Sequence, residues 1–140
     1  MKNVLYILII GFFFSCNSNG PKPIALNSDD CSSCKMQIAD GKFAAEVITT
    51  KGRAYKFDDI FCLKKYLKDN PSTEVKNYYI SDFTQENELI DATTAFFSKG
   101  GSINSPMHGN TIATKSEVDA KKFASEFQSQ PLTWSEVLAN

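Results

Sequence analysis

The sequence lacks the excess of positive charge that would suit a nucleic-acid partner. Its 140 residues carry 15 Lys and Arg against 16 Asp and Glu, which gives a net charge of -1, and no basic stripe runs along it. We therefore expect no nucleic-acid binding. The chain also has only one long apolar run, at its N-terminus. No other part of it is expected to cross a membrane.

That N-terminal run has the features of an export signal. Lys2 precedes the apolar stretch Val4–Phe14, which at about a dozen residues is shorter than the roughly 20 that a spanning helix needs. Ser15-Cys16 follows, and then a polar stretch. We interpret residues 1–15 as a lipoprotein signal peptide that is cut before Cys16, whose thiol then carries lipid. The alternatives are an uncleaved anchor, or an ordinary signal in which Cys16 is incidental.

This interpretation predicts an exported protein that is lipid-anchored to a bacterial membrane and faces the periplasm. Residues 16–30 are rich in Asn, Ser, Pro and Asp, so we expect a lipidated N-terminus followed by a flexible tether. Three thiols remain, those of Cys31, Cys34 and Cys62. An odd number cannot pair completely within one chain in an oxidising compartment. At least one is therefore free, bound to a metal, or paired with another molecule.

The rest of the chain predicts an α+β fold made of two small ββαβ units in tandem, related as an internal repeat. Residues 31–83 form the first unit and 92–140 the second, with 84–91 as a polar connector. In the first unit, strands are expected over 43–49, 53–57 and 75–83, with a helix that Asp58 or Asp59 caps. In the second, strands are expected over 93–98 and 111–114, followed by a helix that begins at Ser116 and a strand or short helix around Trp134.

Soft metal ligands are concentrated at a few positions of these units. The candidates are Cys34, Met36, Met107, Cys31, His108 and Cys62. Thiolate and thioether select Cu(I), Zn or iron–sulfur centres, and imidazole suits copper and zinc. Thioether is absent from the usual zinc ligands, and a [4Fe–4S] cluster normally takes four cysteines. The set therefore favours Cu(I).

Each candidate also has a purely structural interpretation. Cys31 and Cys34 could form a disulfide, Met36 could fill a gap in the core, and Cys62 could be a small buried apolar residue. His108 could simply be solvated in its loop. Lys35, which lies between Cys34 and Met36, is expected to favour the thiolate form of its neighbours.

Together these features resemble the NosL family of exported copper-binding lipoproteins, accessory proteins for nitrous oxide reductase. The resemblance rests on the lipoprotein signal, Cys31-x-x-Cys34-x-Met36, Phe57-Asp58-Asp59 before the helix, and the Ser105-Pro106-Met107 loop. It implies two ββαβ units, Cu(I) binding, and copper delivery toward the copper–sulfide centre of nitrous oxide reductase. Cys34, Met36 and Met107 carry over as site residues. Lys35 and His108 stand where glycine is common in that family, and Cys62 is not part of its general motif.

Three functional hypotheses follow. The first is a copper metallochaperone, which is not an enzyme and which delivers Cu(I) to nitrous oxide reductase or to another exported or membrane copper enzyme. The second is a thiol–disulfide oxidoreductase that uses Cys31 and Cys34. Against it, these cysteines precede a strand, whereas a helix start is what usually lowers the thiol pKa in such enzymes. The third is a binding module in which the two cysteines form only a structural disulfide.

Overall fold

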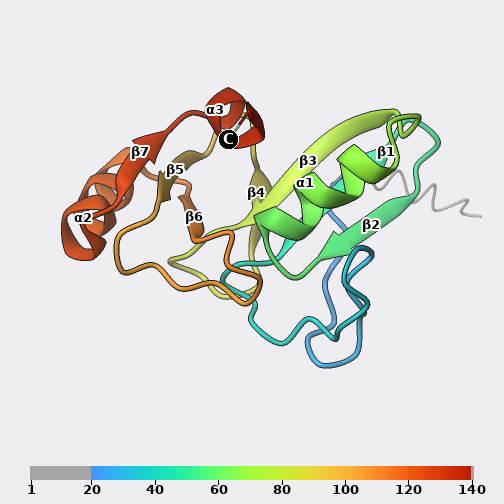
Figure 1. The fold of residues 1–140 in the computed structure, drawn as a ribbon, viewed down its shortest axis with the longest axis horizontal. Coiled ribbons are helices and arrows are strands. Elements are labelled where there is room, and N and C mark those ends of the chain that lie inside the picture. Colours follow the sequence, from blue (N-terminus) through green and yellow to red (C-terminus); the bar gives the residue numbers. More distant parts are fainter. Residues whose placement is uncertain (1–19, 140) are drawn as a thin grey trace, which may run out of the picture.

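The computed structural model describes residues 20–139, which form a mixed α/β fold with two antiparallel sheets and three helices. The predicted signal peptide and Cys16 lie outside the described residues. The two sheets lie side by side along the long axis of the molecule (Figure 1). Within residues 20–139, no helix has both the length and the apolar character needed to span a bilayer.

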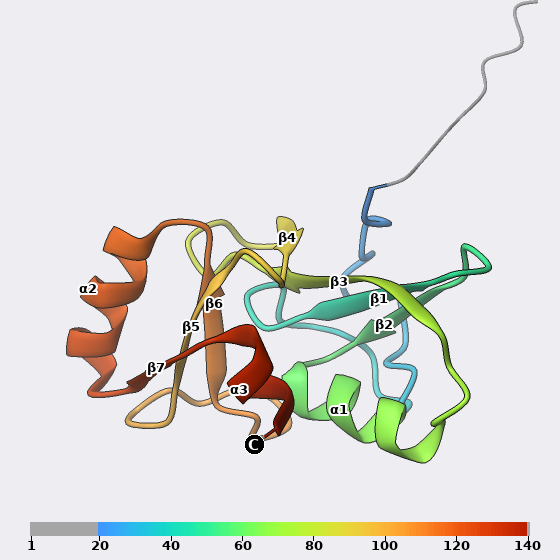
Figure 2. The same ribbon diagram turned by 90° about the horizontal axis from the view of Figure 1, so that it is seen from above.

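The first sheet has four strands in the order β2-β1-β3-β4. They are β1 (Ala45–Thr49), β2 (Ala54–Phe57), β3 (Val75–Ser81) and β4 (Leu89–Asp91), and helix α1 (Ile60–Asp69) follows β2. Helix α1 covers one face of this sheet (Figure 2) and packs there through Tyr66, whose ring lies 5.3 Å from that of Phe57. The strand β4 falls within the predicted connector 84–91. It pairs with β3 through only three residues, so its local sequence gives no clear period.

The second sheet has three strands in the order β6-β5-β7. Its elements are β5 (Phe96–Lys99), β6 (Thr111–Thr114), α2 (Glu117–Phe127), β7 (Gln130–Leu132) and α3 (Trp134–Ala139). The segment around Trp134 is thus a helix preceded by a separate short strand. Both halves contain a ββαβ order in which the first strand lies between the other two. β4 and α3 have no counterparts in the other half, and the internal repeat stays a prediction.

Helix α3 and a short backbone link join the two sheets. The ring of Trp134 lies 5.6 Å from Phe97 on β5 and 5.3 Å from Tyr78 on β3, so one side chain packs against both sheets. The backbone N–H of Phe83 donates to the carbonyl of Ala113 at 2.8 Å. The buried core extends from α1 and the first sheet to Phe97 and Ala113 of the second.

Residues 20–30 pack on the sheet, although the sequence predicted a flexible tether there. Ile24 is buried in the main core. The backbone N–H of Lys22 donates to the carboxylate of the buried Glu46 at 2.8 Å. Lys56 binds the carbonyl of Pro23 and the carboxylate of Asp29, both at 2.6 Å. The apolar Ile24 and these polar contacts, which composition alone does not reveal, make this segment part of the fold. It leaves the first sheet on the side away from α1 (Figure 2).

Candidate metal centre

Cys31 and Cys34 lie in a tight loop that is fastened to the edge of the first sheet. The N–H of Cys31 donates to the carbonyl of Met36 at 2.8 Å, and the N–H of Lys35 donates to the carbonyl of Cys31 at 3.0 Å. The N–H of Ser32 donates to the carbonyl of Lys56 on β2 at 2.7 Å. These bonds close the loop on itself and hold it beside β2. The two cysteines therefore occupy fixed positions before any ligand binds.

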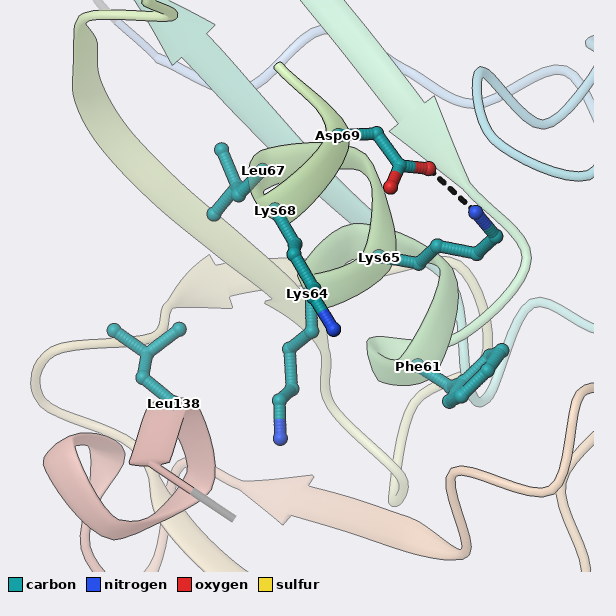
Figure 3. Close-up of a pocket in the computed structure, with 7 residues that line it drawn as sticks. All are labelled: Phe61, Lys64, Lys65, Leu67, Lys68, Asp69 and Leu138. Carbon is teal, nitrogen blue, oxygen red and sulfur yellow. Dashed lines mark hydrogen bonds and ion pairs between the residues drawn. The ribbon is translucent and has the colours of Figure 1, made fainter. Parts of the chain in front are cut away.

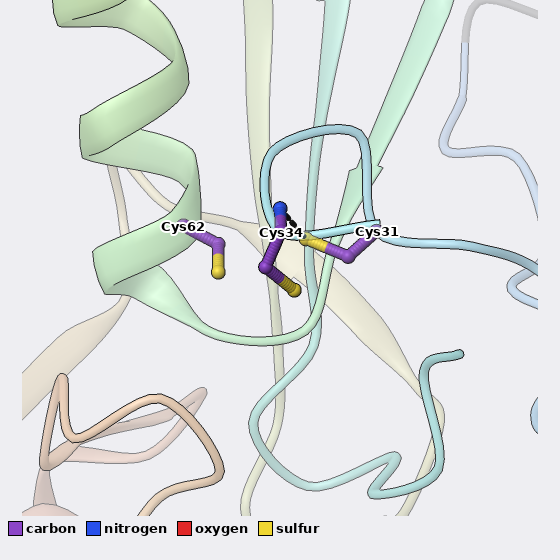
Figure 4. A group of neighbouring side chains, drawn as sticks. All are labelled: Cys31, Cys34 and Cys62. Carbon is purple, nitrogen blue, oxygen red and sulfur yellow. Dashed lines mark hydrogen bonds between the residues drawn. The ribbon is translucent and has the colours of Figure 1, made fainter. Parts of the chain in front are cut away.

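Cys62 approaches the same loop from the first turn of α1. Asp59 caps this helix by accepting from the N–H groups of Phe61 and Cys62. The side chain of Cys62 then points toward the loop that carries Cys31 and Cys34 (Figure 4). The three sulfur atoms all lie within 4.8 Å of one another, and all three thiols are free. The fold thus brings Cys31, Cys34 and Cys62 together, and we call these residues the cysteine cluster.

The spacing of the cysteine cluster suits a single soft metal ion. Thiolates bind zinc at about 2.3 Å, and three sulfurs at that distance in a trigonal arrangement lie about 4 Å apart. Only a small contraction of the cluster would be needed to reach this geometry. Cys31 and Cys62 are buried, whereas Cys34 is partly exposed. Cys34 is therefore the cysteine through which a metal ion would enter or leave.

One sulfur of the cluster is stabilised as a thiolate. The pKa of Cys31 is lowered to about 5, mainly because the thiol of Cys62 donates to it and also because backbone N–H groups of Cys34, Asp58 and Ser33 point at it. The same interaction, together with burial, raises the pKa of Cys62. Burial raises the pKa of Cys34. At neutral pH the cluster accordingly holds one thiolate and two thiols.

The cause of the low Cys31 pKa differs from the one that the sequence suggested. Lys35 was expected to favour the thiolate, but its ammonium donates to the carbonyl of Ser32 at 2.7 Å and is not among the causes of the Cys31 shift. The thiol of Cys62 and then the backbone N–H groups stabilise the thiolate instead. Nearby, burial raises the pKa of the Asp58 carboxyl to about 6, and the negative charge of Cys31 adds to this effect.

We expect the reduced, metal-free protein to show the ultraviolet absorbance of one thiolate at neutral pH. This signal should disappear as the pH falls through about 5, because the pKa of Cys31 lies there. Cys31→Ser should remove the signal at neutral pH, whereas the matched Cys34→Ser variant should keep it. A neutral-pH signal that persists in Cys31→Ser would assign the thiolate to another cysteine.

Asp59 connects the cysteine cluster to the loop that carries Met107. One of its carboxylate oxygens caps α1, and the other accepts from the Ser105 hydroxyl at 2.6 Å and from the N–H groups of Met107 and Gly109 at 3.0 and 3.1 Å. The carboxylate is buried. A single side chain therefore fixes the start of the Cys62 helix and folds the second-half loop against it.

Gly109 allows this close approach. A Cβ atom on Gly109 would lie 2.9 Å from the Ile60 side chain and 3.0 Å from the backbone nitrogen of Phe61. Any larger residue would therefore push the loop away from α1. The sequence predicts at most a capping role for Asp59. One signal could have indicated the second role. A cap uses one carboxylate oxygen, and the other oxygen of a buried Asp needs a hydrogen-bond donor elsewhere in the fold.

The remaining candidates differ in how the fold places them. Met107 is partly buried against the core that contains Cys31 and Cys62, and its backbone is held by Asp59. Met36 is 49% exposed, so the fold does not use it as a core filler. His108 is exposed and lines a separate small pocket with Lys64 and Lys99. Of the two methionines, Met107 is thus the one that the fold attaches to the cysteine cluster.

Lys35 and His108, which stand where glycine is common in the family that the sequence resembles, share a backbone conformation. Their φ angles are 67° and 60°. In this left-handed region glycine pays no Cβ penalty. Glycine at these positions is thus explained by the backbone alone. The imidazole of His108 accordingly gains no support as a ligand from its position in the loop.

The geometry disfavours a thiol–disulfide oxidoreductase. Cys31, the ionised thiol, is buried, whereas attack on a substrate disulfide needs an accessible thiolate. Cys34 is the accessible cysteine, but its pKa is raised. The reactive and the accessible roles thus fall on different sulfur atoms.

This chain is similar to known proteins in both sequence and structure. A sequence model of the family named NosL matches residues 23–140. Among solved structures, the crystal structure of the copper chaperone NosL from Shewanella denitrificans is similar, with a TM-score of 0.72 and 21% sequence identity over 84% of this chain and 94% of that chain. No curated protein matches. The structural likeness shows a shared fold, and because the family match extends over most of the sequence, the chain belongs to the NosL family.

Proposed function

We propose that this protein is an exported, lipid-anchored metallochaperone that binds Cu(I) at the cysteine cluster and delivers it for the assembly of nitrous oxide reductase. The observation that carries the proposal is the meeting of three free sulfurs within 4.8 Å, two of them buried, in a chain of the NosL family. The protein would act by binding and transfer, without catalysing a reaction.

The donor set supports copper over the other soft metals. A structural zinc site is closed by four ligands, and a [4Fe–4S] cluster normally takes four cysteines. The described residues bring together three cysteines. Thiolate and thioether ligands suit Cu(I), Zn and iron–sulfur centres, and thioether is absent from the usual zinc ligands. Met107, whose backbone Asp59 holds, would supply the thioether on the second-half side of the cluster.

The burial of the cluster suggests how copper would be transferred. Cys34 lies at its accessible side, so a ligand from the acceptor protein can replace the Cys34 sulfur first while Cys31 and Cys62 still hold the ion. Because the pKa values of Cys34 and Cys62 are raised, both sulfurs carry protons at neutral pH. Their protons leave when copper binds, and they return when copper departs.

Delivery to nitrous oxide reductase can be tested with purified components. Reduced protein is loaded with one equivalent of Cu(I), mixed with copper-free nitrous oxide reductase, and the copper content of each protein is measured after separation. We expect copper to move to the enzyme faster than from a small-molecule Cu(I) complex of equal affinity. Equal rates would contradict dedicated delivery. Tight Cu(I) binding without transfer would instead favour a different exported or membrane copper enzyme as the acceptor.

Lipid anchoring through Cys16 has its own test. In cells, the full-length protein is expected in the membrane fraction, and Cys16→Ser should move it to the soluble exported fraction with its Cu(I) affinity unchanged. Cys34→Ser serves as the matched control, because it removes a different thiol and should leave the membrane association intact. An unchanged membrane fraction of Cys16→Ser would rule out this anchor.

A further inference from the structure

The outer face of α1 concentrates positive charge around an exposed aromatic side chain. Phe61, Lys64, Lys65 and Lys68 are spaced three and four residues apart, so they form one stripe along the helix (Figure 3). Phe61 is 47% exposed, so its ring is available at the surface of the helix. The acidic residue drawn beside them, Asp69, is paired with Lys65. For a chain with a net charge of -1, this stripe is a local excess of positive charge.

A groove runs beside this stripe, between α1 and α3. It has a volume of about 610 Å³ and is lined by the stripe together with Leu67, Asp69 and Leu138. Leu138 projects from α3 on the far side of the groove (Figure 3), and it is also exposed. The groove thus offers an apolar residue at each side and ammonium groups between them. This is the complement of a segment that carries both acidic and apolar side chains.

A smaller pocket continues from the groove at the Phe61 end. It has a volume of about 90 Å³, and Phe61 and Lys64 line both hollows. Lys64, Lys99 and His108 contribute its ionisable groups, and none of the described residues that line it is acidic. The ammonium groups of Lys64 and Lys99 thus face one hollow with no acidic lining residue to offset their charge. A carboxylate placed between the two lysines would relieve this repulsion.

Both hollows border α1, the helix whose first turn carries Cys62. Phe61 directly precedes Cys62, and its N–H shares the Asp59 oxygen with the N–H of Cys62. The loop that holds Met107 on the core side presents His108 to the small pocket. A protein bound in the groove would therefore contact the helix turn that carries Cys62 and the loop that carries Met107.

We propose that the groove between α1 and α3 is the docking site for an acidic, partly apolar segment of the copper-accepting protein, with a carboxylate of that segment seated between Lys64 and Lys99. This inference rests on the proposed function. The hollowed shape, with a small pocket at one end, suits protein side chains. A membrane surface of anionic lipid would also meet the lysines of the stripe, but a flat bilayer would not lay an apolar segment along the groove between the two helices, and binding to vesicles distinguishes the two.

The test compares charge reversal in the groove with the same charge change elsewhere. Lys64→Glu/Lys68→Glu is compared with wild type and with Lys51→Glu/Lys76→Glu, a control in exposed residues of the first sheet and its turn. Each protein is loaded with Cu(I), and transfer to copper-free nitrous oxide reductase is timed at low and high salt. Cu(I) affinity is measured in parallel with a competing chelator. Binding to vesicles of phosphatidylcholine and phosphatidylserine is measured by sedimentation.

We expect the groove variant to transfer copper at least about tenfold more slowly at low salt, because electrostatic steering changes association rates by 10- to 1,000-fold. Its Cu(I) affinity should be unchanged, and the control should transfer like wild type. Equal rates in all three proteins would overturn the docking site alone. Loss of vesicle binding with unchanged transfer would also overturn it, in favour of a membrane contact. No transfer from wild type or control would overturn delivery to nitrous oxide reductase, and with it the docking site for a segment of that acceptor.

Discussion

Replacing Cys62 by serine is expected to weaken Cu(I) binding far more than replacing Met36 by alanine. Cys62 is one of three sulfurs that lie within 4.8 Å, whereas the Met36 side chain is about half exposed. Loss of an outer-shell partner typically weakens metal binding by roughly 10- to 100-fold, and loss of a ligand should exceed this. We therefore expect the Kd of Cys62→Ser to rise by more than about 100-fold, and that of Met36→Ala by less than about 10-fold.

The measurement is a competition of reduced protein with a Cu(I) chelator, repeated for each cysteine of the cluster and for Met107→Ala. Because Cys62 is buried, Cys62→Ala is measured as well, and thermal unfolding shows whether each variant is folded. Cys31→Ser should behave like Cys62→Ser. If Cys62→Ser keeps its affinity while Met36→Ala loses it, the site would consist of the Cys-x-x-Cys-x-Met segment, without the thiol on α1.

Removing the Asp59 side chain should have the largest effect on stability. Asp59→Ala deletes the cap of α1, worth about 1 kcal/mol, and leaves the donors of Ser105, Met107 and Gly109 without their acceptor. A buried donor without a partner costs about 1–3 kcal/mol. With partial relaxation of the loop toward solvent, we expect the free energy of unfolding to fall by about 3–5 kcal/mol.

Urea unfolding of Asp59→Ala and Ser116→Ala separates the two roles of Asp59. Ser116 caps α2 by accepting from the N–H of Asp119 and has no such loop attached, so its loss should cost about 1 kcal/mol. Equal destabilisation of the two variants would show that the bonds to the Met107 loop contribute nothing. Asp59→Asn, which keeps one carbonyl acceptor, should fall between them and allows Cu(I) affinity to be measured on a folded protein.

Local pattern was sufficient to predict most of the regular elements. Alternating residues located the strands before and after Lys51-Gly52, and Asp59 and Ser116 cap the two long helices as expected. The three residues of β4 and the packing of residues 20–30 were missed. Both depend on partners far along the chain, such as Glu46 for the N–H of Lys22, and these contacts leave no local period.

The candidate site was predictable in composition but not in arrangement. The sequence supplied the soft ligands, yet the meeting of Cys62 with Cys31 and Cys34 depends on the bond from Ser32 to Lys56 and on the start of α1 at Ile60. The low pKa of Cys31 depends mainly on the hydrogen bond from the Cys62 thiol and then on the direction of backbone N–H groups, and residue types specify neither. The ammonium of Lys35 binds the carbonyl of Ser32, so the charge of this residue did not predict the cause of the low Cys31 pKa.

The packing of residues 20–30 on the first sheet changes how far the protein could reach from a membrane. If lipid is attached at Cys16, only the chain from there to residue 20 separates the anchor from the folded domain, and fully extended it spans at most about 14 Å. The domain would then be kept within one protein diameter of the lipid surface. Encounters would be confined to two dimensions. Because the N-terminal segment leaves the first sheet on the side away from α1 (Figure 2), the groove on α1 would lie on the far side of the domain from the anchor. An acceptor would then present its docking segment about one domain thickness away from the headgroups, and copper would be passed sideways between membrane-bound neighbours.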